Sequence, residues 1–440
     1  MQRINKEGNK SMIRQKIEEL YDWKQRKNRK PLVIQGARQV GKTWLMKTFA
    51  EEAFPQYIYI NFEETPALRS LFEKDFDMKR ILFEIYLATG KQVEDETLLI
   101  LDEIQEAPRG ITALKYFCEK MPHLPVMAAG SLLGIASHQH DSFPVGKVDF
   151  INLYPLSFFE FVDAMGQEHL LEPLRMQQWD ATQTVASRLE SLLRQYYYVG
   201  GMPEVVQSFA DNGDLKEVRR LQQAILDSYD RDFSKHAPIE EVPRLRMVWN
   251  SVSGQLSKEN KKFIYGFIKA GARAKNFELA IEWLRDAGLL YKVNRAKKGQ
   301  MPLSAYEDFA AFKVFLLDVG LLASMCGLST NALLAESTLF SDYRGALTEQ
   351  YVFQQLKLSK ENSIYYWSAD NSRGEIDFLM QHDGKIIPIE VKAEDNLQSK
   401  SLRMFIEANQ GLHGVRFSMA PYREQSWMTN YPLYAIEAVL

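Results

Sequence analysis

The chain has 440 residues, of which 46% are hydrophobic and 25% are charged, and its formal net charge is -3. This length allows two to four domains with buried cores, and the near-neutral charge excludes a global attraction to nucleic acid, which would have to bind through local patches. No segment approaches the ~20 apolar residues of a membrane span, and the N-terminus lacks an apolar signal core. The two cysteines, Cys118 and Cys326, lie far apart in sequence. We therefore expect a cytoplasmic protein with reduced thiols and no membrane partner.

The first elements predict a phosphate-binding site. An amphipathic helix over residues 10–25 precedes an apolar strand at 31–35, and a helix is expected to begin at Thr43. Between strand and helix lies the spacing Gly, four residues, Gly-Lys-Thr, in which glycines let backbone N–H groups approach a polyphosphate and the helix adds its positive end. The expected ATP-binding residues are Gly36, Ala37, Arg38, Gln39, Val40, Gly41, Lys42, Thr43 and Trp44. Lys42 would reach the β- and γ-phosphates, and Thr43 would hold Mg²⁺.

An acidic pair is the expected partner of this loop. After a strand at 57–62 and helical sequence around 68–87, the apolar run 97–104 contains Asp102 and Glu103. Its continuous hydrophobicity predicts a central parallel strand, and ligands gather at the carboxyl ends of such strands. We expect Asp102 to act as a metal carboxylate and Glu103 as the base that polarises an attacking water.

A further strand at 124–131 follows a helix at 111–121, and Ser131 closes it as an expected γ-phosphate sensor. The series of phosphate loop, Leu-Asp-Glu and Gly-Ser resembles an AAA-type ATPase of the additional-strand class. This resemblance implies that the sensor strand lies between the loop strand and the acidic strand. The adjacent acids Asp102 and Glu103, with Ser131 beyond, favour ATP hydrolysis over phosphoryl transfer to a small acceptor.

The segment 143–161 resembles a bacterial and archaeal family that joins such an ATPase to a C-terminal domain of uncharacterised role. Members usually have Gly-Arg before a Tyr-Pro-Leu-Ser-Phe stretch, whereas this chain has Lys147 in place of the arginine. Lysine keeps the charge but loses the bidentate fork, so Lys147 is either a weaker phosphate contact or a solvated strand residue. No strong arginine finger is evident, and a homo-oligomer stays open.

The middle of the chain predicts helices and then a hairpin. The aromatic motif at 196–204 is expected to be core packing, and Arg231 to pair with neighbouring acids or to contact nucleotide. A helix at 277–287 is followed by strands at 289–293 and 313–318 with a basic loop between them, which is a winged-helix outline. DNA binding and a plain solvated surface are both consistent with the basic side chains there: Lys258, Lys261, Lys262, Lys269, Arg273 and Lys275.

A second cluster of chemical side chains is expected near the C-terminus. A helix that begins at 344 carries Glu349, and two strands at 374–380 and 386–393 are joined by a turn. Glu390 and Lys392 are two residues apart on one strand and share a face, where Asp377 of the neighbouring strand would join them. With a helix at 397–408, this order resembles the PD-(D/E)xK nuclease superfamily, although the proline usual before the acid is absent. The resemblance implies Mg²⁺ held by Glu349, Asp377 and Glu390, with Lys392 assisting phosphodiester attack.

Together these patterns predict an α/β chain. It has an AAA-like P-loop ATPase domain with a central parallel sheet (1–165), a helical lid (166–242), a winged-helix-like domain (243–330) and a restriction-endonuclease-like domain (331–440). The expected function is Mg²⁺-dependent ATP hydrolysis coupled to a DNA-binding and nuclease-like region. Two alternatives remain: a nucleotide-controlled switch that binds DNA or a protein partner without cleavage, and a metal-dependent nuclease gated by the ATPase.

Overall fold

The computed structural model describes residues 14–130, 144–256, 262–329, 341–358, 362–369, 374–393 and 398–440. These residues divide into two compact units. The N-terminal unit comprises Arg14–Tyr154 and Asp286–Gly288, and the C-terminal unit comprises Pro155–Arg285 and Leu289–Leu440. The four-part division expected from the sequence stays a prediction.

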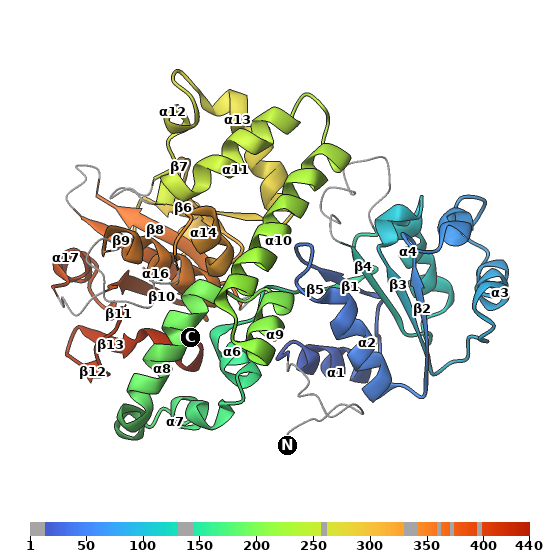
Figure 1. Cartoon of the computed structure of the whole chain (residues 1–440), viewed down its shortest axis with the longest axis horizontal. Helices are drawn as coiled ribbons and strands as arrows, with labels where there is room; N and C mark the ends of the chain where they lie inside the picture. The colour runs from blue at the N-terminus through green and yellow to red at the C-terminus, as the bar shows by residue number, and fades with distance from the viewer. Residues whose placement is uncertain are drawn as a thin grey trace. The chain divides into compact units, whose positions relative to one another are not determined.

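The N-terminal unit is built on a parallel five-stranded sheet in the order β2-β3-β4-β1-β5 (Figure 1). Its strands are β1 (Leu32–Gln35), β2 (Gln56–Asn61), β3 (Thr97–Asp102), β4 (Val126–Gly130) and β5 (Asp149–Asn152). Its helices are α1 (Ile17–Gln25), α2 (Lys42–Ala53), η1 (Pro66–Phe72), α3 (Met78–Thr89), η2 (Ile104–Glu106) and α4 (Gly110–Lys120). Strand β4 separates β1 from β3, which confirms the strand order that the additional-strand class implies.

Helices cover the sheet because its strands are apolar on both faces; all six residues of β3 are buried. Side chains of α3 and α4 share a hydrophobic core with one face of the sheet, including Ile60, Leu99 and Leu101. Helix α2 packs on β2, β3 and β4 through buried side chains such as Leu45 and Phe49. Since parallel strands end at one edge, this sandwich places the carboxyl ends of β1 and β3 together.

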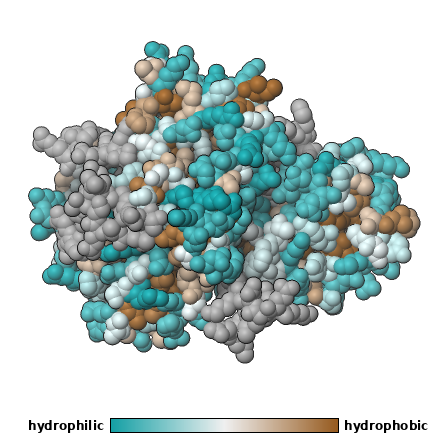
Figure 2. Space-filling view, viewed as in Figure 1, coloured by the Kyte–Doolittle hydropathy of each residue, from teal (hydrophilic) through white to brown (hydrophobic). Residues whose placement is uncertain are grey.

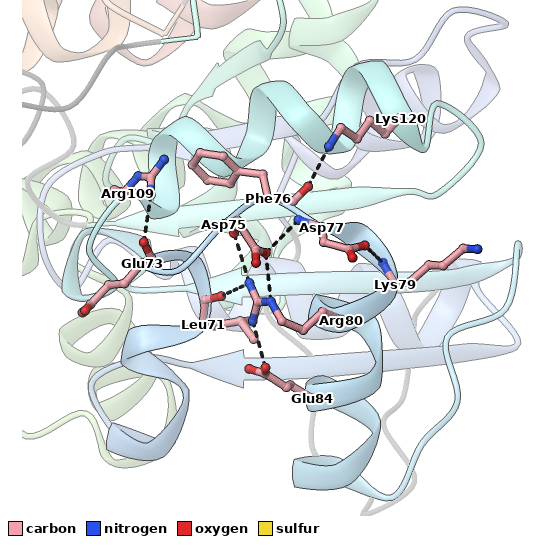
Figure 3. Close-up of polar contacts among 10 residues, drawn as sticks. All are labelled: Leu71, Glu73, Asp75, Phe76, Asp77, Lys79, Arg80, Glu84, Arg109 and Lys120. Atoms are coloured by element: carbon pink, nitrogen blue, oxygen red, sulfur yellow. Dashed lines mark hydrogen bonds and ion pairs between the residues drawn. The ribbon is translucent and has the colours of Figure 1, made fainter.

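Hydrogen bonds from two arginines stabilise the connection between β2 and α3 (Figure 3). Arg80 of α3 donates to Asp75 Oδ1 at 2.9 Å and to Glu84 Oε1 at 2.8 Å. Arg109, at the start of α4, donates to the carbonyl oxygen of Glu73 at 2.8 Å. The connection is therefore held both by α3 itself and by the segment that follows the acidic strand.

Helix α3 also carries exposed apolar side chains. Phe83, Tyr86 and Leu87 are 58%, 44% and 65% exposed. Figure 2 shows hydrophobic residues at the surface where Figure 1 places α3. The described residues cover these three side chains only in part.

The C-terminal unit contains a mixed eight-stranded sheet in the order β12-β13-β11-β10-β9-β8-β6-β7. Its strands are β6 (Leu290–Ala296), β7 (Glu307–Leu316), β8 (Ser363–Ser368), β9 (Glu375–His382), β10 (Lys385–Val391), β11 (Gly414–Ser418), β12 (Arg423–Glu424) and β13 (Met428–Pro432). The hairpin β6–β7 joins this sheet through a parallel pairing of β6 with β8. One sheet thus crosses the boundary expected at residue 330.

The helices of the C-terminal unit surround this sheet (Figure 1). They are α6 (Phe158–Ala164), η3 (Glu168–Leu171), α7 (Glu172–Arg175), α8 (Trp179–Val199), α9 (Pro203–Asn212), α10 (Leu215–His236), α11 (Val242–Leu256), α12 (Tyr265–Ile268), α13 (Ala274–Asp286), η4 (Leu303–Tyr306), α14 (Val319–Met325), α16 (Ser341–Leu356), α17 (Lys400–Ala408), η6 (Leu433–Ala435) and α18 (Ile436–Val439). Phe378 of β9 contacts Phe353 of α16, whereas its neighbour Leu379 packs in the cluster around α17. Adjacent strand residues face opposite sides, so α16 and α17 cover opposite faces.

The aromatic motif at 196–204 is part of the core, as expected. Its three tyrosines are buried, and the Tyr196 hydroxyl bonds to the Leu156 carbonyl. A Cβ added at Gly200 would lie 2.1 Å from Asp318 Oδ1, and one at Gly201 would lie 2.2 Å from the Leu156 oxygen. The Gly-Gly pair is therefore required because two other segments pass too close for any side chain.

Both cysteines are free. Among the described residues, no helix combines the length and apolar character needed to cross a membrane.

Candidate nucleotide site and C-terminal carboxylate cluster

The phosphate loop joins β1 to α2 and leaves no room for a side chain at its start. A Cβ added at Gly36 would lie 2.3 Å from the carbonyl oxygen of Leu153. Gln39 and Gly41 have left-handed backbone, with φ of 66° and 91°, and Gly41 caps α2. The local sequence therefore forms a tight loop that ends at a helix N-terminus, which is a favourable place for a phosphate.

Lys42 is buried and points back into this loop. Its ammonium donates to the carbonyl oxygens of Gly36 at 3.0 Å and Ala37 at 2.8 Å. Burial lowers the pKa of Lys42 to about 8, against the opposing effect of Glu103 and Asp102. Carbonyl oxygens are uncharged, so the more negative oxygens of a polyphosphate would compete effectively for the same ammonium.

Asp102 brings the two predicted motifs together. The Thr43 hydroxyl donates to Asp102 Oδ2 at 2.6 Å, and the Tyr59 hydroxyl donates to the same oxygen at 2.9 Å. Burial and Asp102 raise the pKa of Tyr59, so its hydroxyl stays protonated. The Lys47 ammonium lies 3.8 Å from the centre of the Tyr59 ring. Thr43 and Asp102, the two predicted magnesium ligands, thus lie within hydrogen-bond distance of each other. Tyr59 donates a second hydrogen bond to the same carboxylate.

Glu103 follows in left-handed backbone, with φ of 50°. That conformation costs a residue other than glycine about 1–2 kcal/mol. The N–H of Glu103 donates to Asp102 Oδ1 at 3.0 Å, and its Oε2 accepts from Gln105 Nε2 at 2.6 Å. The strand therefore ends in a tight turn at Glu103, and the Glu103 carboxylate is held by Gln105.

Oxygen donors at this site fit a magnesium ion. A threonine hydroxyl and a buried carboxylate that touch each other are of the kind Mg²⁺ prefers, with nucleotide oxygens and water completing the shell. The residues that would hold the ion are Thr43 and Asp102.

Sequence reasoning missed two contributors to this site. Tyr59 lies on the neighbouring strand β2, and Arg14 precedes α1. Arg14 is buried and donates to the carbonyl oxygens of Val40 at 2.9 Å and Tyr154 at 2.6 Å, so it braces the loop from behind. No local pattern marks either residue, because both act on partners distant in sequence.

The remaining predicted residues of the N-terminal unit have mixed outcomes. Trp44 lies in the first turn of α2 and is 37% exposed. Ser131 lies outside the described residues. Lys147 forms an ion pair with Glu119 at 2.9 Å, and Glu119 raises the pKa of Lys147. This exposed pair agrees with the solvated-residue interpretation of Lys147.

In the C-terminal unit, the predicted cluster is gathered only in part. Strands β9 and β10 are paired neighbours, and Asp377 Oδ2 accepts from the N–H of Val391, the residue after Glu390 on β10, at 2.7 Å. Lys392 pairs with Glu390 Oε1 at 3.1 Å. Glu390 is buried, and within the described ranges its Oε2 has no hydrogen-bond partner.

Glu349 has a different partner from the one expected. It is buried on α16, where its Oε1 accepts from Lys313 at 2.9 Å. Across the described ranges, no three His, Cys, Asp or Glu side chains converge closely enough to hold a metal ion. The structure therefore does not assemble Glu349, Asp377 and Glu390 into a ligand set, because Lys313, which sequence reasoning missed, engages Glu349 instead.

Arg231 lies at a cavity of about 460 Å³ between α10, α11 and α14. Asp227 and Asp230 also line it, and Asp230 pairs with Arg246 at 2.9 Å. Among the predicted basic residues, Lys262, Lys269, Arg273 and Lys275 are exposed, while Lys258 and Lys261 lie outside the described residues.

Residues 28–162 match the model of an AAA domain. With the strand order and the loop geometry, this match defines the N-terminal unit as an AAA-type P-loop ATPase domain, for which nucleotide binding is a property of the class. The match covers less than half of the chain. Residues 190–332 match a domain of unknown function (DUF8612), and residues 344–436 match another (DUF4143).

A comparison with curated proteins found no match. Among solved structures, a Walker-type ATPase of Pyrococcus abyssi is 14% identical, with 74% of this chain and 98% of that chain covered and a TM-score of 0.46. The Aeropyrum pernix ORC1 protein in complex with DNA is 10% identical, with 71% and 90% covered and a TM-score of 0.28. Cdc6p from Pyrobaculum aerophilum is 12% identical, with 74% and 95% covered and a TM-score of 0.26. These scores are too low to carry an argument about this chain.

Proposed function

We propose that this protein is an Mg²⁺-dependent ATPase that couples its nucleotide state to a DNA-binding and nuclease-like C-terminal region. The observation that carries the ATPase part is the contact between Thr43 and Asp102 at 2.6 Å, with Glu103 next in the chain. It joins a phosphate loop to an acidic strand end within one small site.

Each residue of the site has a role in this proposal. The Lys42 ammonium exchanges the loop carbonyls for the β- and γ-phosphates, and the N–H groups of the loop hold the remaining phosphate oxygens. Glu103 accepts the proton of the attacking water, and Gln105 orients its carboxylate. Thr43 and Asp102 would hold Mg²⁺, which would supply positive charge to offset that of the phosphates.

The DNA-binding part rests on the order of α11, α12 and α13 followed by the hairpin β6–β7, which fits a winged helix. The exposed lysines and arginine of the helical segment and the exposed Lys297 and Lys298 of the hairpin would contact phosphates. Arg295 pairs with Asp308 at 2.6 Å and is left out of this set.

The nuclease-like part rests on element order and register. A helix (α16), three strands (β8, β9 and β10), a second helix (α17) and a further strand (β11) follow in sequence. Asp377 and Glu390 lie on the paired strands β9 and β10, and Asp377 accepts from the N–H of the residue that follows Glu390. Both features support the superfamily resemblance as a statement about fold.

ATP turnover measured with and without duplex DNA tests the proposal. We expect Mg²⁺-dependent turnover that DNA increases several-fold. Absence of turnover in the presence of Mg²⁺ would overturn the ATPase part. ATP turnover that is the same with and without DNA would instead favour a second candidate, a nucleotide-controlled switch that binds a partner without cleavage. The ion pair between Lys313 and Glu349 supports this candidate, because it engages one of the predicted metal ligands.

A further inference from the structure

The carboxylate cluster of the C-terminal unit contains a lysine contributed by a distant strand. Lys313 lies on β7, and its side chain is fully buried. The ammonium forms ion pairs with Glu349 of α16 at 2.9 Å and with Glu375 of β9. It also lies 5.0 Å from the centre of the Tyr366 ring. One cation thus joins two acidic side chains from separate elements.

A bulge in β9 turns a third carboxylate toward this lysine. Tyr365 of β8 pairs with Leu379, whereas Trp367 pairs with Ile376, so β9 contains one extra residue between these pairs. Such a bulge places two successive residues on one face and re-aims the side chain before it. Phe378 contacts α16, the helix that carries Glu349. Because Asp377 and Phe378 are the two successive residues that the bulge places on one face, Asp377 lies on the face of the sheet that α16 covers.

The charges of these groups support each other. Burial opposes the positive charge of Lys313, but Glu349, Glu375 and Asp377 outweigh it and raise the pKa of Lys313. An ammonium has three donors and no acceptor, so it satisfies carboxylates in the way that a metal ion does, at a lower charge. A Mg²⁺ ion would need carboxylate oxygens at about 2.0–2.1 Å. The Lys313 ammonium occupies the position between the Glu349 and Glu375 carboxylates where such an ion would lie.

We propose that the Lys313 ammonium takes the place of a divalent cation in this cluster. The native cluster is then independent of metal, and removal of the Lys313 side chain leaves the two carboxylates that pair with it, those of Glu349 and Glu375, to bind one hard divalent cation of the Mg²⁺ or Mn²⁺ class. The inference rests on the nuclease-like fold proposed for this region. It assigns that region to binding without metal-dependent cleavage.

Binding of Mn²⁺ to the full, nucleotide-free chain tests this inference, with free Mn²⁺ followed by electron paramagnetic resonance. We expect Lys313→Met to bind about one more equivalent than the wild type, and Lys313→Met/Glu349→Gln to lose it. Lys313→Arg keeps a buried cation and should behave as the wild type. Lys292→Met is the matched control, because it removes a lysine from the adjacent strand β6 outside the cluster.

Two results would overturn the inference. The first is a folded Lys313→Met chain that gains no Mn²⁺. The second is a wild-type chain whose Mn²⁺ binding disappears in Glu349→Gln or Asp377→Asn, a measurement that remains decisive if Lys313→Met does not fold. ATP turnover measured on the same wild-type preparation separates the proposals, since its absence would overturn the ATPase part and leave the metal result standing.

Discussion

Among the residues that the structure describes, each unit buries one lysine, Lys42 or Lys313, and the two lysines are held in different ways. Lys42 donates to two backbone carbonyls, and burial lowers its pKa to about 8. Lys313 is paired with carboxylates, which raise its pKa. An ammonium that donates only to neutral carbonyls can exchange them for the charged oxygens of an anionic ligand. The charge of an ammonium that is paired with carboxylates is already neutralised by them. The comparison assigns Lys42 to ligand binding and Lys313 to permanent internal pairing.

The largest effect expected is on hydrolysis. Glu103→Gln should lower ATP turnover by about 10²–10⁴-fold, because the amide cannot accept the proton of the attacking water. Nucleotide affinity should stay within a few-fold of the wild type, since Lys42 and the loop are unchanged. Steady-state turnover and binding of a fluorescent ATP analogue measure both, with Glu106→Gln as the control. Unchanged turnover would remove Glu103 from the role of base.

The lysine of the C-terminal cluster should matter for stability. Lys313→Met leaves Glu349 buried without its cation, and loss of one partner of a buried pair costs about 3–5 kcal/mol in the free energy of unfolding. Guanidinium denaturation followed by tryptophan fluorescence measures the loss, and Mn²⁺ should restore part of it. Lys292→Met should cost clearly less, because Lys292 lies 3.8 Å from its acidic partner. Equal losses of unfolding free energy in Lys313→Met and Lys292→Met would contradict the special role of Lys313.

The lysine of the phosphate loop should give a pH dependence. With its pKa lowered to about 8, Lys42 is charged at pH 7 and loses its proton as pH rises through 8. The affinity of the nucleotide-free chain for ATP should therefore fall roughly tenfold between pH 7 and pH 9. Calorimetric titration over this range measures the decline. Lys42→Arg stays charged and should show a flat profile, and a wild-type profile as flat as that of the variant would disprove the assignment.

The smallest effect is expected at the exposed ion pair of the N-terminal unit. Lys147→Ala removes a solvated contact with Glu119, so ATP turnover should remain within about twofold of the wild type. A large loss of turnover would instead show that Lys147 acts on phosphate, in the place of the arginine found in similar proteins. The same turnover assay with Lys120→Ala provides the control.

Local sequence patterns predicted most elements near the nucleotide site. The loop, the strand expected within 97–104 and the helix expected from Thr43 form within two residues of their expected bounds, because continuous apolar runs and a fixed glycine spacing are local signals. The position of β4 between β1 and β3 followed from the family resemblance. By contrast, Arg14 and Tyr59 were not predicted, since each acts on a partner tens of residues away.

The C-terminal region shows the limit of local patterns more clearly. Asp377, Glu390 and Lys392 were expected together; Glu390 pairs with Lys392, whereas Asp377 bonds to the backbone N–H of Val391. The hairpin β6–β7 was expected in a separate domain, yet it joins the same sheet. Strand pairing between distant segments depends on burial of whole faces, which no single stretch encodes.

The sequence by itself determined that this protein has a phosphate loop followed by an acidic strand, because the chemistry of each requires a fixed order of neighbouring residues. It also placed the C-terminal acids on two adjacent strands. Only the tertiary structure decided which cation the acid of the preceding helix, Glu349, meets. Lys313 reaches Glu349 across 36 residues and through a sheet that joins two predicted domains. The partner of a buried charge is set by packing, and packing is decided by the whole fold.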